Sequence, residues 1–192
     1  RISDNHWKRL HRAEQQIADT YSGIRKMTYV GGRLAAKNAF QLLNVRSQPV
    51  VNSESGAPLV SAGMNISITH KKNVAFALVS KKNNTTVGID FETLLPNRNG
   101  IASKVLTEQE LAFQETLPQE LHWQHTLVAF STKESVYKAL QPRLNHYIGF
   151  DEAVIEVGQT YETIVTLQLK ERAHLPNNNR LLGLRARHKW FD

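Results

Sequence analysis

The sequence predicts an α+β fold built from two similar lobes. A long stretch with helical periodicity is followed by short apolar runs of strand length, and this order occurs once in each half of the chain. The two halves share negligible sequence identity, so the repeat lies in the pattern alone. We place the boundary after residue 86, which gives an N-terminal lobe of residues 1–86 and a C-terminal lobe of residues 87–192.

The N-terminal lobe is predicted to begin with two helices and to continue into strands. Apolar residues at helical spacing predict an amphipathic helix from Asp4 to Ala18, and a second helix is expected over residues 25–43. Residues 48–63 contain Pro49, Gly56 and Pro58 and are expected to be irregular. Apolar runs with polar turns between them predict three antiparallel strands, at 65–69, 73–80 and 85–91.

The C-terminal lobe repeats this order with a shorter helix in front. Thr107 and Glu110 have the spacing of a capping box, which predicts that a short helix begins there. A long helix is expected over residues 118–140. Three more strands are expected, at 152–158, 161–169 and 181–188.

Composition narrows the class of protein. The 192 residues are enough to bury a core, and 41% hydrophobic with 21% charged residues is ordinary for a globular protein. The absence of cysteine excludes disulfides and thiolate metal sites. Since no apolar run is long enough to span a bilayer and the start does not resemble a signal peptide, we expect a cytoplasmic protein without a membrane partner.

The net charge of +7 is distributed unevenly along the chain. Residues 1–86 hold 13 Lys/Arg against 4 Asp/Glu, and residues 87–192 hold 11 against 13. The first lobe therefore favours an anionic partner. Nucleic acid is one such partner. Because the basic residues are scattered and not interleaved with aromatic ones, a smaller polyanion fits equally well.

Two short segments carry candidate chemistry. If Val87–Glu92 forms a strand, Asp90 and Glu92 point to one face, and paired carboxylates suit magnesium, which binds carboxylates together with substrate phosphates. On the long helix, Glu134 and Lys138 are four residues apart and share a face. Taken alone, the first pair could equally be solvent-facing strand residues, and the second a pair that only stabilises the helix.

Four segments in order resemble the signatures of the 4'-phosphopantetheinyl transferases, in the monomeric two-lobed type that serves siderophore and surfactin synthetases. Gly31–Lys37 resembles the early Gly-Arg-x-Ala-Ala helix of the family, and Ser67–His70 followed by Ala75–Ala77 resembles its Ser-x-Ser-His strand pair. Val87–Glu92 matches Gly-Ile-Asp-x-Glu, and Phe130–Lys138 matches Trp/Phe-Ser-x-Lys-Glu-x-x-x-Lys. Together the matches cover roughly residues 30–150.

The resemblance implies a fold and a reaction. The fold is a pseudo-two-fold pair of α+β lobes with the active site in the cleft between them. In the reaction, a serine hydroxyl of an acyl or peptidyl carrier protein attacks the β-phosphorus of coenzyme A, and 3',5'-ADP leaves. The resemblance implies that carboxylates hold a magnesium ion, and the residues in question are Asp90, Glu92 and Glu134. It implies that coenzyme A is bound by Arg33, Lys37, Ser67, His70, Lys133 and Lys138.

Several points stay open at this level. Either Glu134 or a metal-bound hydroxide could act as the base for the carrier serine. The family often has Lys or Arg between the Gly and Pro of its substrate loop, where this chain has Ala57. We expect a monomeric enzyme with an acidic carrier protein as partner and no nucleic-acid partner. The alternatives are a basic nucleic-acid-binding module and a catalytically idle protein that docks carriers.

Overall fold

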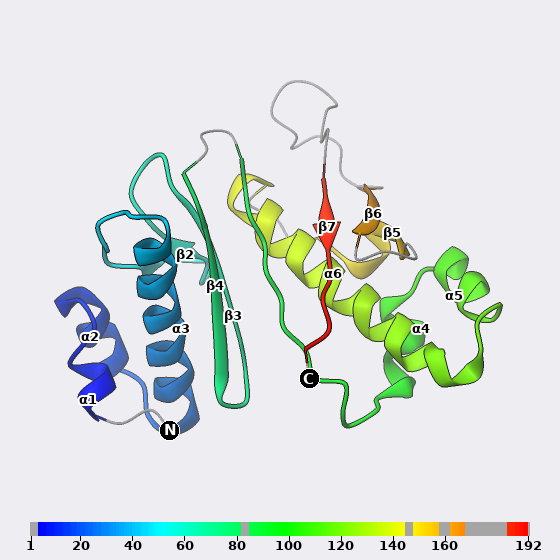
Figure 1. Cartoon of the computed structure of the whole chain (residues 1–192), viewed down its shortest axis with the longest axis horizontal. Helices are drawn as coiled ribbons and strands as arrows, with labels where there is room; N and C mark the ends of the chain where they lie inside the picture. The colour runs from blue at the N-terminus through cyan, green and yellow to red at the C-terminus, as the bar shows by residue number, and fades with distance from the viewer. Residues whose placement is uncertain (1–3, 82–84, 145–147, 158–161, 168–183, 192) are drawn as a thin grey trace. The chain divides into compact units, whose positions relative to one another are not determined.

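The computed structural model describes residues 4–81, 85–144, 148–157, 162–167 and 184–191 (Figure 1). The chain divides into two compact units. Unit 1 comprises Arg1–Phe91 with Lys138–Pro142, and unit 2 comprises Glu92–Tyr137 with Arg143–Asp192. Both combine helices with antiparallel strands, which confirms the predicted α+β class. None of the helices in the described ranges has the length and apolarity needed to cross a membrane.

Unit 1 consists of helices packed on a β-hairpin. Its elements are α1 (Asp4–Trp7), α2 (Arg12–Asp19), α3 (Gly23–Leu42), β1 (Val51–Asn52), β2 (Pro58–Leu59), β3 (Asn65–Lys71) and β4 (Val74–Ser80). Helix α3 lies along β3 and β4 (Figure 1). Phe40, Val50, Ile66 and other apolar side chains form the core between them. Gly32 permits this packing, because a Cβ atom at that position would lie 2.9 Å from Cγ2 of Ile68.

The prediction of one helix from Asp4 to Ala18 is wrong, because the chain forms two short helices there. His11 has an extended backbone, with φ −64° and ψ 151°, and α2 begins directly after it. The Glu14 carboxylate accepts a hydrogen bond from the His11 amide at 2.9 Å, as in the N-terminal turn of a new helix. Apolar residues on both sides of the interruption at His11 still pack together, since Leu10 is buried in a cluster with Trp7 and Ile17.

The central hairpin is predicted correctly, and its third strand is not. Strands β3 and β4 pair antiparallel, with Ile68 opposite Ala77, and cover the expected runs 65–69 and 73–80. The structure assigns no strand to residues 85–91. This segment is held by side-chain hydrogen bonds, because the amide of Ile89 donates to the Ser67 hydroxyl at 3.1 Å.

Unit 2 consists of short helices, one long helix and a three-stranded sheet. Its elements are η1 (Asn99–Ile101), α4 (Ala102–Val105), α5 (Glu108–Gln114), η2 (Gln119–Leu121), α6 (His122–Leu144), η3 (Phe150–Glu152), β5 (Ala153–Val157), β6 (Glu162–Leu167) and β7 (Ala186–Arg187). The sheet order is β5-β6-β7, with antiparallel pairing throughout. The capping box is confirmed, since Thr107 precedes α5 and accepts from the Glu110 amide.

The other predictions for unit 2 hold with shifted boundaries. Helix α6 is the long helix expected over 118–140, and η2 precedes it. Strands β5 and β6 occupy residues 153–157 and 162–167 of the expected runs 152–158 and 161–169, of which residues 158, 161, 168 and 169 lie outside the described ranges. Of the run 181–188, residues 186–187 form β7, and residues 181–183 lie outside the described ranges.

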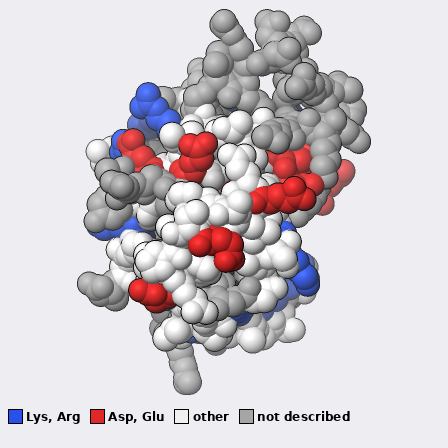
Figure 2. Space-filling model, turned by 90° about the vertical axis from the view of Figure 1, so that its right-hand side faces the viewer, with Lys and Arg blue, Asp and Glu red and all other residues white. Residues whose placement is uncertain are grey.

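Figure 2 shows one face of the molecule coloured by charge, on the side that carries α4 and α5. Asp and Glu side chains lie across the middle of this face, and Lys and Arg lie towards its margins (Figure 2). This distribution agrees with the slight acidic excess of residues 87–192.

Candidate functional site

The candidate site in unit 1 is centred on the Asp90 carboxylate. The Lys138 ammonium donates to Asp90 Oδ1 at 2.6 Å, and the Thr69 hydroxyl donates to the same oxygen at 3.1 Å. The Asp90 side chain is 6% exposed, whereas that of Lys138 is 26% exposed. Asp90 Oδ2 is buried and has no hydrogen-bond partner among the described residues. One oxygen of this carboxylate is therefore held by the protein, and the other retains its full capacity to accept.

Strand β3 positions Asp90 through alternate side chains. Ile66 and Ile68 pack in the core with α3, so Ser67 and Thr69 point to the opposite face of the strand. Both are buried, and their hydroxyls bind Ile89 and Asp90. Thr69 is absent from the predicted site, although its spacing of two from Ser67 on a strand would have indicated it.

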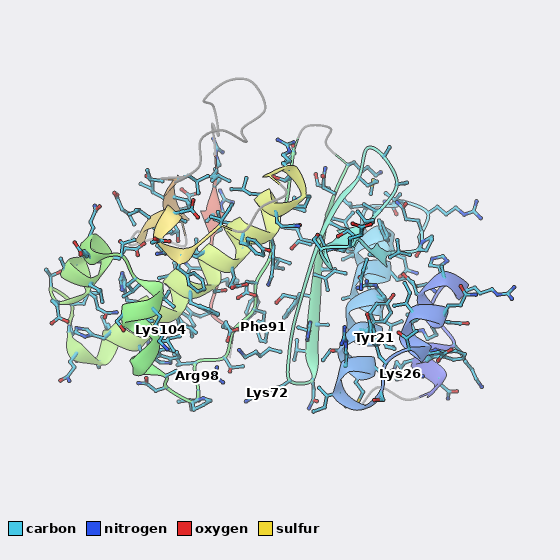
Figure 3. The ribbon with its side chains drawn as sticks, turned by 180° about the vertical axis from the view of Figure 1, so that it is seen from behind. Tyr21, Lys26, Lys72, Phe91, Arg98 and Lys104 are labelled. Atoms are coloured by element: carbon cyan, nitrogen blue, oxygen red, sulfur yellow. The ribbon has the colours of Figure 1, made fainter. Side chains whose placement is uncertain are left out.

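An aromatic contact also supports the segment that carries Asp90. The rings of Phe91 and Phe76 lie 5.0 Å apart between their centroids, so the residue after Asp90 packs on strand β4. Figure 3 labels Phe91 on this segment. The apolar anchor on one side of Asp90 and the Ser67 contact on the other restrict the position of its backbone.

His70 follows Thr69 at the end of β3. Desolvation of the imidazole first, and the positive charge of Lys138 second, lower the pKa of His70 below its ordinary value. The neutral form is therefore favoured near pH 7. Neutral imidazole offers one donor and one acceptor, so His70 can donate a hydrogen bond to a phosphate oxygen without a charge.

The ammonium of Lys133 lies inside unit 2. It donates to Glu110 Oε2 at 2.6 Å, to the Val105 carbonyl at 2.8 Å and to the Phe150 carbonyl at 2.8 Å. The side chains of Lys133 and Glu110 are 1% and 2% exposed. Desolvation by burial lowers the pKa of Lys133, and the hydrogen bond and charge of Glu110 oppose that effect. All three N–H donors of the ammonium are thus occupied within the protein.

Two other predicted phosphate-binding residues have internal partners. Arg33 is buried on α3, where its Nε donates to the Val50 carbonyl at 2.8 Å and its Nη2 donates to Asn52 Oδ1. Lys37, one turn further along α3, is half-buried and donates to the Arg9 carbonyl at 3.0 Å.

The predicted metal ligands fall in both units. Asp90 belongs to unit 1, and Glu92 and Glu134 belong to unit 2, where both are half-buried. No group of three His, Cys, Asp or Glu side chains suited to a metal ion is found within the described ranges. Of the three predicted ligands, Asp90 is the one whose fit to a cation is supported by a direct observation. Its Oδ2 atom is buried and accepts no hydrogen bond from a described residue. Carboxylate oxygens of this kind are the ligands that magnesium prefers.

Comparison with known proteins identifies the family. Residues 86–183 match the profile of the 4'-phosphopantetheinyl transferase superfamily, and residues 13–80 match that of the 4'-phosphopantetheinyl transferase N-terminal domain. The chain is 33% identical over 143 residues to the 4'-phosphopantetheinyl transferase PptT of Mycobacterium tuberculosis, a match that covers 72% of this chain and 60% of the relative.

Other relatives give the same result. Enterobactin synthase component D of Salmonella typhi is 33% identical over 135 residues, which are 68% of this chain and 54% of the relative. The 4'-phosphopantetheinyl transferase Svp of Streptomyces mobaraensis is 30% identical over 159 residues, which are 81% of this chain and 63% of the relative. The chain thus spans less than two thirds of the length of each of these curated relatives. The two family profiles and the extent of these matches show that the chain belongs to the 4'-phosphopantetheinyl transferase superfamily.

Proposed function

We propose that this protein transfers the 4'-phosphopantetheine arm of coenzyme A to a serine of an apo acyl or peptidyl carrier protein and releases 3',5'-ADP. The observation that carries the proposal is the Asp90 carboxylate, which is held on one oxygen by Lys138 and Thr69 and has its other oxygen buried without a partner from the described residues. Family membership supports the same activity. The pseudo-two-fold relation of the lobes and the active-site cleft are part of the proposal and rest on the resemblance.

Each residue of the site has a proposed task. Asp90, Glu92 and Glu134 would hold magnesium, which when bound neutralises charge on the pyrophosphate of coenzyme A. Lys138 donates a hydrogen bond to Asp90 and places a positive charge beside it, where it attracts phosphate oxygens. His70 donates a hydrogen bond to a phosphate, and Lys37 contributes positive charge. Glu134 is a candidate base for the carrier serine.

Three of the residues expected to bind coenzyme A are better assigned to positioning. Ser67 holds the backbone that precedes Asp90 through the Ile89 amide. Lys133 fixes α6 to Glu110 and to two backbone carbonyls, so we propose that it sets the helix face on which Glu134 and Lys138 lie. Arg33 binds the chain at Val50 and Asn52.

The direct test is mass spectrometry of an apo carrier protein after incubation with coenzyme A, magnesium and this protein. We expect the carrier to gain the mass of one phosphopantetheine group, and a carrier that has alanine in place of the acceptor serine to gain nothing. An unmodified carrier, together with steeply salt-dependent retention of the protein on DNA, would support the nucleic-acid-binding alternative. An unmodified carrier that nevertheless binds the protein would support the idle docking alternative.

Lys138→Ala is expected to weaken coenzyme A binding and to slow transfer together. The ammonium carries charge that acts in the ground state and in the transition state, and its loss also leaves Asp90 with Thr69 as its remaining donor. Steady-state kinetics with varied coenzyme A should show a higher KM and a lower kcat. Lys104, an exposed lysine on α4, provides the matched control Lys104→Ala. Unchanged kinetics for Lys138→Ala would mean that Lys138 only stabilises the structure.

Added salt is expected to raise the KM for an acidic carrier before it lowers kcat. The excess of basic residues lies in residues 1–86, and exposed charges attract a partner over about a Debye length, roughly 8–10 Å near physiological salt. Lys72, at the β3–β4 turn (Figure 3), and Arg25 are exposed, so reversing either to Glu should reproduce the effect of salt. Lys26 is a weaker choice, because it already pairs with Asp19 at 2.9 Å. A carrier KM that stays constant with ionic strength would indicate apolar docking.

A further inference from the structure

Val50 lies where the chain enters strand β1, and it is almost completely buried. Its residue exposure is 1%, and its side chain packs in the core with Phe40 and Ile66. The ladder between β1 and β2 begins one residue later, with Val51 opposite Leu59. The N–H and C=O groups of Val50 therefore need partners other than a strand, because buried backbone groups are almost always hydrogen-bonded.

Two charged side chains supply those partners. Glu14 on α2 accepts from the Val50 amide through Oε1 at 2.9 Å, and Arg33 on α3 donates to the Val50 carbonyl through Nε at 2.8 Å. Arg33 also donates to Asn52 Oδ1, and its guanidinium lies 4.1 Å from the centroid of the Tyr29 ring. Glu14 and Arg33 thus hold both backbone groups of one residue, an arrangement that we call the Val50 clamp.

The burial of both clamp residues indicates a specific role. Glu14 is 3% exposed and Arg33 is 6% exposed. Burying such charges is costly and adds little net stability, whereas their directional hydrogen bonds define one geometry. The guanidinium of Arg33 is directed to Val50, Asn52 and the Tyr29 ring, and its burial separates it from solvent. A clamp of this kind defines where β1 begins and how the following turn is oriented.

The turn that follows is a compact unit that reaches α6. The Ser53 amide donates to the Ala57 carbonyl at 2.8 Å, and the Gly56 amide donates to the Ser53 carbonyl at 2.9 Å. Gly56 has φ +86°, a left-handed conformation that glycine adopts without strain. At the tip, the Ser55 hydroxyl accepts from Gln141 Nε2 at 2.7 Å. A short, hydrogen-bonded hairpin therefore connects the segment at Val50 to residue 141.

Gln141 lies on the same face of α6 as Lys138, because residues three apart in a helix are neighbours. Lys138 in turn binds Asp90. We propose that Glu14 and Arg33 are positioning residues for the reaction: their hold on Val50 sets the Ser53–Ala57 turn against Gln141 and so fixes the part of α6 that presents Lys138. This inference rests on the proposed function; it adds Glu14 to the positioning residues and says how Arg33 acts without contact to coenzyme A.

The first experiment measures hydrogen exchange in the variants Glu14→Gln and Arg33→Lys. Glu14→Gln preserves size and Arg33→Lys preserves charge, and each weakens part of the clamp. Amides of residues 50–57 should exchange about tenfold faster than in the parent protein, because the opening free energy of that segment falls. Amides of α5 in unit 2 should keep their parent rates, which shows that the fold is intact. Arg12→Lys, an exposed substitution on α2, is the matched control and should change neither segment.

The second experiment separates positioning from direct contact by kinetics. Both clamp variants should raise the KM for coenzyme A about tenfold and change kcat by less than about twofold, because Lys138 is displaced and not removed. In a Lys138→Ala background, Glu14→Gln should cause no further rise in KM, since the two changes act through the same charge. Gln141→Leu should raise the KM as the clamp variants do and leave the exchange of the Val50 amide at its parent rate.

The outcomes distinguish the alternatives. Parent exchange rates over residues 50–57 in both clamp variants would overturn the proposal. A raised KM in Arg33→Lys with unchanged exchange would also overturn it and would make Arg33 a direct phosphate contact. Faster exchange with an unchanged KM would disprove the link to Lys138. If the parent protein did not modify any carrier, the proposed function would fail, while faster exchange in both variants would still support the clamp.

Discussion

Asp90→Asn is expected to lower the rate of phosphopantetheine transfer by at least about 10²-fold, the effect of removing one preorganised charged contact from a transition state. The side chain keeps its size, and its amide oxygen can still accept from Thr69 and Lys138, so the fold should persist. The charge that would attract a cation at Oδ2 is lost. The rate of carrier modification, followed by mass spectrometry, measures the effect.

A control and a second readout make this prediction specific. Asp19→Asn changes an exposed carboxylate of the same unit, which pairs with Lys26, and should leave the rate unchanged. Coenzyme A with magnesium should raise the thermal stability of the parent protein, because a ligand that binds the native state stabilises it, and should raise that of Asp90→Asn much less. A near-normal rate in Asp90→Asn would contradict the assignment. Glu92→Gln and Glu134→Gln test the two further proposed ligands in the same way.

Glu110→Leu is expected to destabilise the protein by about 3–5 kcal/mol, the usual cost of removing one partner of a buried ion pair. The substitution leaves the Lys133 ammonium buried with two carbonyl partners, and it also removes the acceptor for the amides of Ile155 and Thr107. Urea denaturation followed by circular dichroism gives the change in the free energy of unfolding. Glu108→Leu, an exposed change in the same helical turn, should have little effect.

The pH dependence of this variant follows from the same contact. Burial lowers the pKa of Lys133, and Glu110 opposes that effect, so loss of Glu110 lowers the pKa further. Between this lowered folded-state pKa and the unfolded pKa of lysine, the folded state binds fewer protons than the unfolded chain, so the free energy of unfolding of the variant rises with pH. The destabilisation caused by Glu110→Leu should therefore shrink as the pH rises through that range. A deficit that is small at pH 7, or that grows with pH, would contradict the structural role of the pair.

Local patterns predicted the parts of the fold that depend on neighbours in the sequence. The alternation of β3 and β4 and the capping box at Thr107 are examples, because each is defined within a few residues. The candidate site came from four ordered segments that resemble one family. Of these candidates, Asp90 and Lys138 make a direct contact across 48 positions of sequence.

The features that were missed depend on tertiary packing. Spacing alone cannot show that Lys133 points into the core while Lys138, five residues later on the same helix, reaches Asp90. Residues 85–91 have the composition of a strand, but they are held by side chains of β3, β4 and α6, which composition does not reveal. Glu14 lies within the predicted amphipathic helix, and its contact with Val50, 36 positions away, depends on the tertiary fold.

The attachment of residues 89–90 to β3 through two hydroxyl groups has a consequence for protein engineering. A carboxylate carried on a paired strand could be moved only by changing the backbone register of the sheet. Here the Ser67 and Thr69 hydroxyls set the height of Asp90 above β3, and neither side chain takes part in the β3–β4 ladder. Serine and threonine both carry the hydroxyl on Cβ, so exchanging them would keep these contacts and change only a methyl group packed beside them. Positions 67 and 69 are thus the places where a change of one methyl group would move the Asp90 carboxylate without altering the register of the sheet.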